Sequence, residues 1–121
     1  MSLGKELGSF SFKITSSTYE AEGTRVNVEG AAEGFGPVTG TLVFRTEPGQ
    51  QTIGTVTWRG AAFPENGAVL SGVGEGSYEA LGRHQWRTRS VIRTSDGRIF
   101  GSDGVIDIAK RTFTGKNLEW S

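Results

Sequence analysis

Apolar and polar side chains alternate along almost the whole of this 121-residue chain, and no stretch shows an apolar stripe of helical period. A period of two places successive side chains on opposite faces of a β-strand. Phe10, Phe12 and Ile14 share one face of the first such segment, with polar residues between them. Similar alternation marks residues 25–29, 38–45, 52–62, 68–79, 83–94, 99–109 and 112–120. The pattern therefore predicts eight antiparallel strands and no helix.

Eight strands with no helix to cover a sheet favour closure into a barrel. Such a barrel is just wide enough to be filled by side chains or to hold one small ligand. The 19 glycines would supply bends at barrel corners and room inside the lumen. We therefore predict an all-β chain that forms a single antiparallel eight-stranded up-and-down barrel domain over residues 1–121. Residues 1–8 are expected to be disordered or partly vector-derived.

Hairpin geometry predicts which side chains of residues 70–94 line the lumen. A loop over residues 80–82 would pair Tyr78 with His84, set a glycine opposite Trp86, and place Glu75 and Glu79 opposite arginines on the outer face. Opposite charges directly across a ladder stabilise it, and a Trp side chain can cover a cross-strand glycine. This register directs five side chains inward: Tyr78, His84, Trp86, Thr88 and Ser90.

A turn at Pro48-Gly49 predicts a second register. It pairs Phe44 with Ile53, and the same parity turns Arg59 inward and Trp58 outward. A bulge at residues 60–62 would reverse that assignment.

Whether Asp103 and Asp107 face the lumen or the solvent depends on the length of one turn. A strict two-residue Asp-Gly turn before them would direct both carboxylates into the lumen and would expose Phe100, Ile106 and Ile108. Burial of three large apolar side chains is worth about 5 to 8 kcal/mol, and two unpaired buried carboxylates cost several kcal/mol more. We therefore favour a longer loop or a bulge that leaves both aspartates in solvent. The inward placement would give the cavity a carboxylate pair.

Charge and composition exclude several classes of function. Thirteen basic residues balance thirteen acidic ones, and although the arginines gather in residues 83–93, no aromatic residues interleave with them on the outer face as a nucleic-acid platform requires. A chain with no Cys and one His has no disulfide framework, thiol chemistry or histidine-cluster metal site. We expect no metal, no cofactor and no nucleic-acid or membrane partner, and homo-oligomerisation is left open. The lack of cysteine and of a signal-peptide-length apolar run favours a cytoplasmic location.

Several short motifs resemble those of an uncharacterised family of small bacterial proteins. They are Glu33-Gly34-Phe35-Gly36, Thr57-Trp58-Arg59-Gly60, Gly72-Val73-Gly74-Glu75-Gly76, Trp86-Arg87 and Glu119-Trp120. The likeness covers about two thirds of the chain. It implies an allene oxide cyclase-like barrel, close in shape to the lipocalins. It implies no catalytic residues, because the site residues of the plant cyclases have no matching motif here.

Three functions are compatible with such a barrel. The first is a binding module that holds one small, mostly apolar molecule in the cavity. Its candidate ligand-binding residues are Trp86, His84, Tyr78, Arg59, Thr88 and Ser90. The second is a cyclase or isomerase that folds a flexible substrate into a reactive conformer, and the third is a packed structural or interaction domain.

An ionisable pair inside the barrel would distinguish the enzyme from the binding module. His84 is the only side chain whose unperturbed pKa lies near neutrality. As a general acid or base it would need a carboxylate partner and a substrate within reach, and its alternative is an ordinary packed or solvated histidine. With one His and its carboxylates placed outside, the sequence favours binding.

Overall fold

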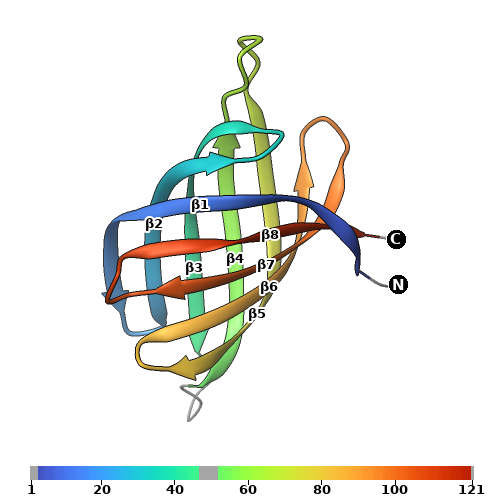
Figure 1. Ribbon diagram of the computed structural model, residues 1–121. Helices are drawn as coiled ribbons and strands as arrows, with labels where there is room; N and C mark the ends of the chain where they lie inside the picture. The colour runs from blue at the N-terminus through green and yellow to red at the C-terminus, as the bar shows by residue number, and fades with distance from the viewer. Residues whose placement is uncertain (1–2, 47–51, 121) are drawn as a thin grey trace.

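Eight antiparallel strands follow one another around a closed barrel in chain order, and β1 pairs with β8 to complete it (Figure 1). This computed structural model describes residues 3–46 and 52–120. The strands are β1 (Leu3–Glu20), β2 (Gly23–Ala32), β3 (Gly36–Thr46), β4 (Ile53–Ala62), β5 (Leu70–Gly82), β6 (Gln85–Thr94), β7 (Ile99–Asp107) and β8 (Thr112–Trp120). The eight-stranded barrel predicted from the alternation is confirmed. β1 begins at Leu3, so residues 3–8, expected to be disordered, belong to a strand.

The length of β1 is what closes the barrel. Its first part pairs with β8, from Leu3 opposite Trp120 to Lys13 opposite Thr112. Its later part pairs with β2 as far as Glu20, and a bulge between Ile14 and Ser16 shifts the register there. A bulge bends the strand that carries it and increases its twist, which helps this long strand follow the curve of the barrel between β8 and β2.

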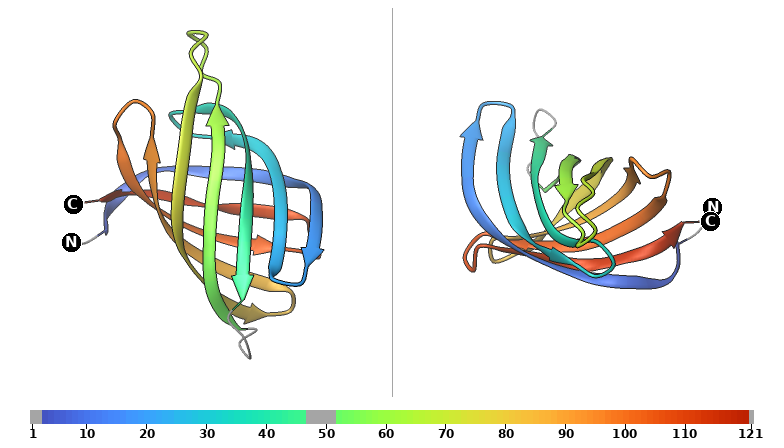
Figure 2. Two further views of the ribbon diagram at one scale, coloured as in Figure 1. Left: turned by 180° about the vertical axis from the view of Figure 1, so that it is seen from behind. Right: turned by 90° about the horizontal axis from the view of Figure 1, so that it is seen from above.

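The two ends of the barrel differ (Figures 1 and 2). At one end, here called the mouth, lie the β2–β3, β4–β5 and β6–β7 connections together with the start of β1 and the end of β8. At the other, the closed end, lie the β1–β2, β5–β6 and β7–β8 turns.

The apolar core fills the closed end. Its buried side chains come from nearly every strand: Phe12, Ile14, Val26, Val28, Leu42, Phe44, Val56, Tyr78, Ile106 and Phe113. Tyr78 meets the ring of Phe44 edge to face at 5.3 Å, and its hydroxyl donates to the carbonyl oxygen of Arg45 at 3.2 Å. Burial raises the pKa of Tyr78. Each such large side chain stabilises the fold by about 1.5 to 3 kcal/mol.

The β5–β6 pairing confirms the inward faces but not the predicted partners. The turn is Arg83-His84 rather than residues 80–82, so Tyr78 faces Thr88 and not His84. The register differs from the predicted one by four residues, and an even shift keeps the paired residues Tyr78, Trp86, Thr88 and Ser90 on their predicted inner face. The prediction for His84 is wrong, because this residue lies in the turn and is exposed.

The glutamates of β5 accordingly point outward but pair with other arginines. Glu79 lies 3.5 Å from Arg89, and Glu75 lies 2.7 Å from Arg93. The predicted register had placed them opposite Arg83 and Arg87. Arg93 lowers the pKa of Glu75 by hydrogen bonding.

The predicted β3–β4 register is wrong by an odd number of residues. Phe44 pairs with Val56 rather than Ile53, so Trp58 turns inward and Arg59 outward. An odd shift exchanges the two faces of a strand. The Pro48-Gly49 turn on which the prediction depended lies outside the described residues.

The β6–β7 hairpin resolves the placement of the two aspartates. A three-residue loop over 95–97 sets Arg89 opposite Asp103, so neither aspartate faces the lumen. Arg87 donates from Nε and Nη2 to the two carboxylate oxygens of Asp103 at 3.0 and 2.7 Å, and this lowers the pKa of Asp103. The favoured parity is thus confirmed for Asp103, Phe100 and Ile106, but Ile108, which follows the end of β7, is exposed rather than buried.

Asp107 differs from the expectation in one respect: it is buried, with 7% of its surface exposed. Its carboxylate accepts hydrogen bonds from Gln85 Nε2 at 2.8 Å and from the backbone N–H of Lys110 at 2.9 Å. These donors lower the pKa of Asp107. They solvate its carboxylate in place of water, which was expected to surround it. Asp107 therefore anchors the β7–β8 turn.

Candidate ligand-binding cavity

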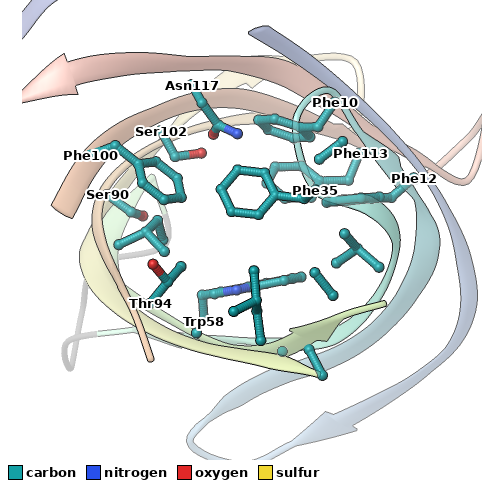
Figure 3. A pocket seen from close by; sticks show the side chains of 18 of the residues that line it. Phe10, Phe12, Phe35, Trp58, Ser90, Thr94, Phe100, Ser102, Phe113 and Asn117 are labelled. Carbon is teal, nitrogen blue, oxygen red and sulfur yellow. The ribbon is translucent and has the colours of Figure 1, made fainter. Parts of the chain in front are cut away.

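A cavity of about 80 Å³ lies inside the mouth half of the barrel (Figure 3). Its walls are mostly apolar, and the aromatic contributions are Phe10, Phe12, Phe35, Trp58, Phe100 and Phe113. Phe12 and Trp58 come from β1 and β4, and their rings stack across the lumen at 5.9 Å with an angle of 6° between them. Below them the packed core begins, so this stacked pair forms the floor of the cavity.

A row of polar side chains interrupts the apolar wall. Ser90, Ser102 and Asn117 are direct cross-strand partners on β6, β7 and β8, so they stand side by side at one level. Figure 3 shows their polar ends directed toward the cavity. Asn117 is 7% exposed. No side chain or backbone group of the described residues forms a hydrogen bond with the side chains of these three residues.

The unpaired amide of Asn117 is open to the cavity rather than sealed in protein. Among the described residues, every fully enclosed side-chain nitrogen or oxygen has a hydrogen-bond partner. An unpaired polar atom therefore keeps contact with free space. Asn117 lines both the cavity and a groove on the outside of the mouth, so its amide lies where a bound molecule would meet it.

The part of the cavity lining that the structure describes contains no ionisable side chain. Its polar groups are hydroxyls, one amide and the indole N–H of Trp58, which form hydrogen bonds but do not exchange protons near neutral pH. General acid–base catalysis by a side chain needs a titratable group within hydrogen-bond reach of the substrate. The described lining is chemically suited to holding a neutral molecule.

Phe35 covers the cavity at the mouth. It lies in the β2–β3 turn between Gly34 and Gly36, whose φ angles of 84° and 83° are in the left-handed region that favours glycine. Its ring packs against Phe100 at 5.5 Å, and Figure 3 shows it in the midst of the other lining side chains. The guanidinium carbon of Arg98 also lies over this ring, 4.4 Å from its centre.

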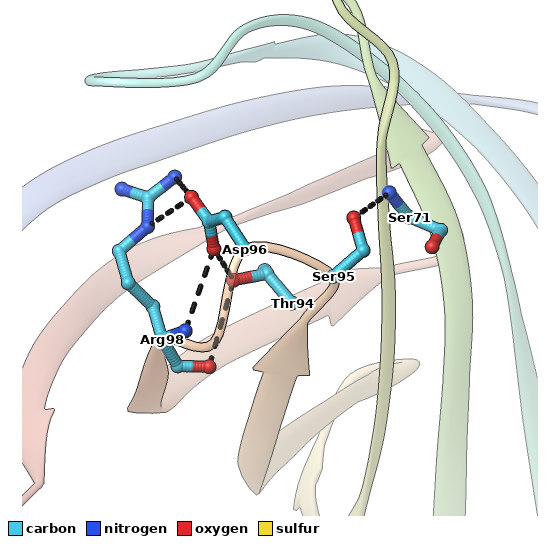
Figure 4. Close-up of polar contacts among 5 residues, drawn as sticks. All are labelled: Ser71, Thr94, Ser95, Asp96 and Arg98. Atoms are coloured by element: carbon cyan, nitrogen blue, oxygen red, sulfur yellow. Dashed lines mark hydrogen bonds and ion pairs between the residues drawn. The ribbon is translucent and has the colours of Figure 1, made fainter.

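Asp96 holds Arg98 in that position (Figure 4). Its Oδ2 accepts from Arg98 Nε at 2.9 Å and lies 2.8 Å from Nη2, and its Oδ1 accepts from the hydroxyl of Thr94. These hydrogen bonds, that from Arg98 first, lower the pKa of Asp96 to about 2. The adjacent Ser95 ties the same loop to β5, because its hydroxyl accepts the backbone N–H of Ser71 at 3.1 Å. The hairpin that supports the Phe35 cover is therefore internally braced.

A groove of about 440 Å³ on the outer surface meets the cavity at the mouth. Phe35, Phe100 and Asn117 line both spaces and so form the partition between them. Leu7 and Ile99 add exposed apolar surface to the groove. A molecule that reached the cavity by this route would pass Phe35.

Two of the six predicted site residues line the cavity, namely Thr88 and Ser90. Thr88 is buried, and its hydroxyl donates to the carbonyl oxygen of Gly104 at 3.5 Å. Tyr78 is buried in the core below the cavity, and Trp86 packs against that core. Neither contributes to the lining.

The other two predicted site residues, His84 and Arg59, lie on the outside of the barrel. His84 is exposed in the β5–β6 turn at the closed end, opposite the mouth. Arg59 is exposed on the outer face of β4, next to the inward-facing Trp58. The predicted role of these two side chains in a cavity has no support from their positions.

The residues that the prediction missed fall into two groups. Ser102 and Asn117 share strand parity with Phe100 and Phe113, so the alternation alone could have placed them inside once those aromatic residues were assigned to the core. Phe35 lies in a turn, where no alternation exists. Only the tertiary structure could place it over the cavity.

No family model and no curated protein matches the sequence, and no solved structure matches it. Among the described residues, no helix is long and apolar enough to cross a membrane.

Proposed function

We propose that this barrel binds a small, mostly apolar, uncharged molecule in the cavity at its mouth. The observation that carries the proposal is an internal space lined by aromatic rings from five separate segments of the chain, with hydrogen-bonding groups on one wall. Ligand pockets typically combine an apolar lining with a few polar groups that fix orientation. The eight-stranded closed topology is also compatible with the allene oxide cyclase-like barrel that the sequence motifs suggest.

Binding is proposed rather than catalysis because the described lining offers no general acid or base. A purely structural domain would not need to leave a space in its core. Unfilled volume inside a protein destabilises the fold by roughly 24 cal/mol for each Å³. A space of about 80 Å³ beside unpaired polar groups is therefore better explained by an occupant.

The size of the cavity limits its ligand. An engineered cavity of about 150 Å³ accepts benzene, and the space here is about 80 Å³. A single ring would enter only if the Phe35 side chain moved outward. The flanking glycines allow that turn to change its backbone conformation at little steric cost.

Toluene, a neutral single ring, is the probe for this proposal. We expect a titration followed by ¹H–¹⁵N NMR to shift the indole N–H signal of Trp58 in a saturable manner. Replacement of Ala32 by Leu would fill the cavity and abolish the shift, because Ala32 lines it. Replacement of its exposed neighbour Ala31 by Leu is the matched control and should leave binding unchanged.

A third variant tests the cover. Phe35→Ala removes the ring at the mouth, and we expect toluene to bind more tightly by about threefold to tenfold, because the closed state no longer competes. Absence of any saturable shift in both the wild type and Phe35→Ala would refute the proposed function.

A further inference from the structure

We propose that the cavity is adapted to a flat, uncharged ring with an amide-like edge, meaning an N–H donor beside a C=O acceptor. This inference rests on the proposed function and names the chemical class of its ligand. It is carried by the row formed by Ser90, Ser102 and Asn117, and by the apolar surfaces that face that row.

An unpaired amide in an apolar barrel requires an explanation. Asn117 is 7% exposed and has no hydrogen-bond partner among the described residues. The amide is open to the cavity, so its donor and acceptor groups are available to a bound molecule. A purely apolar occupant would leave them unpaired at a cost of about 1 to 3 kcal/mol. Of the positions with the same parity on β8, Phe113 is apolar, Gly115 has no side chain, and Glu119 is exposed at the mouth, so Asn117 is the one buried polar side chain among them. The amide therefore serves something other than packing.

The side chain of asparagine presents an NH₂ donor and a C=O acceptor along one edge. A ligand with only a carbonyl, or only an ether, would leave one of these two groups unpaired. A cis-amide edge such as that of a lactam satisfies both with two parallel hydrogen bonds. The hydroxyl of Ser102, directly across the β7–β8 pair, can either donate or accept at the same edge.

The charge of the ligand follows from the lining. A charged group that leaves water for an apolar cavity loses its hydration and needs an opposite charge or a dense set of hydrogen bonds. The described lining provides hydroxyl and amide groups but no opposite charge. The ligand that fits is uncharged at neutral pH.

The shape of the ligand follows from the apolar walls. Phe10 and Phe113 lie together with their ring centres 5.0 Å apart, and Trp58 forms part of the floor. Aromatic walls favour a flat apolar body. A volume of about 80 Å³, enlarged by outward movement of Phe35, limits that body to a single ring, with the polar edge turned toward Asn117.

The experiment compares 2-pyridone, a single-ring lactam, with phenol and toluene by ¹H–¹⁵N NMR titration of the whole protein. We expect 2-pyridone to bind at least tenfold more tightly than toluene and more tightly than phenol. We also expect it to shift the side-chain NH₂ signals of Asn117. Asn117→Leu should weaken 2-pyridone binding by about tenfold and leave toluene binding unchanged or tighter. Ser102→Ala should give a smaller loss of a few fold.

Ser77→Ala is the matched control for the serine variant. Ser77 is exposed on the outer face of β5, so its removal should affect neither probe. Thermal unfolding of each variant checks that it is folded, and the comparison of probes on the wild type needs no variant at all.

The outcomes separate this inference from the proposed function. If toluene binds in the cavity and 2-pyridone binds no better, the amide-edge inference is overturned and the binding function stands. Equal affinity of Asn117→Leu and wild type for 2-pyridone would also overturn it. If no ring compound binds to the wild type or to Phe35→Ala, both proposals fail.

Discussion

Trp58 occupies the floor of the cavity because the residues beneath its ring have no side chains. A Cβ added at Gly40 on β3, or at Gly60 on β4, would overlap with the six-membered part of the indole. Glycine is common in strands where another group approaches the backbone closely. The orientation of Trp58 thus depends on two glycines. Gly40 lies on the neighbouring strand β3, and Gly60 lies on the same strand as Trp58.

Gly40→Ala is therefore expected to displace the indole. We expect a loss of about 1 to 3 kcal/mol in the free energy of unfolding, the range for overpacking a filled site, and a change in tryptophan emission. Urea unfolding followed by fluorescence measures both. Gly72→Ala is the control, since a Cβ there would meet its nearest neighbour, Thr94 Cγ2, at an ordinary 3.6 Å. Equal stability of the two variants would contradict this account of Trp58.

At the scale of the strand pairs, the β5–β6 turn explains why its register was mispredicted. Arg83 and His84 have φ angles of 52° and 64°, the two positive values that a type I′ turn requires. Asn-Gly is the usual sequence for that turn, and neither residue is present here. The turn is thus set by the pairing of the strands and not by its own residues.

The substitution of Arg83-His84 by Asn-Gly should stabilise the protein. Both positions would then carry residues that tolerate a positive φ, and we expect a gain of about 1 kcal/mol in the free energy of unfolding. Urea denaturation of the double variant measures it. A loss of stability would show that Arg83 or His84 makes contacts that outweigh the backbone preference.

The β6–β7 hairpin carries a pH dependence that can be assigned to one carboxylate. Because the pKa of Asp96 falls from 3.8 to about 2 in the folded state, the folded protein binds its proton less readily than the unfolded chain does. The resulting stabilisation is present above pH 3.8 and is lost as the pH falls toward 2.

Asp96→Asn should remove that part of the dependence. We expect the melting temperature of the wild type to fall more steeply than that of the variant between about pH 4 and 2, with the wild type the more stable above pH 4. Thermal unfolding over this range, monitored by circular dichroism, measures the difference. Parallel curves for the two proteins would show that the bracing of Arg98 by Asp96 contributes no stability.

In these hairpins, the alternation of apolar and polar residues predicted which side chains face the lumen, but not which residues pair across the strands. Parity placed Tyr78 and Thr88 inside from local pattern alone, and the cost of burying carboxylates placed Asp103 outside. The position of a turn determines which residues pair across the hairpin. The free energy that favours one turn position over another is small compared with the free energy gained by burying one face of a strand. A register error of three residues, an odd number, sufficed to exchange Trp58 and Arg59.

At the scale of the whole molecule, the barrel has no free edge within the described strands. β1 and β8 close it, and the ends of the chain meet at the mouth, where Leu3 lies opposite Trp120. The closed barrel was predictable because strands without covering helices must pair their edges or leave them exposed. The cavity was not, because its lining brings together residues from separate strands and one turn.

The meeting of the two ends makes the barrel suitable for circular permutation. A variant with a short glycine linker between the original ends, and new ends between Arg83 and His84, should fold to the same barrel with a modest loss of stability. Domains whose ends lie close together usually tolerate such rearrangement. Cooperative thermal unfolding and retained toluene binding are the expected results. A variant without a cooperative transition would show that the β5–β6 turn must form for the barrel to close.

The described lining of the cavity has no titratable side chain, and this has a consequence for the protein in its surroundings. Uptake and release of an uncharged guest would not respond to acidification or alkalinisation as long as the fold itself persists. Occupancy would follow only the free amount of the guest and the ease with which the aromatic cover swings aside. On the proposed binding function, the affinity of the cavity for its guest would therefore be the same at every pH at which the barrel is folded.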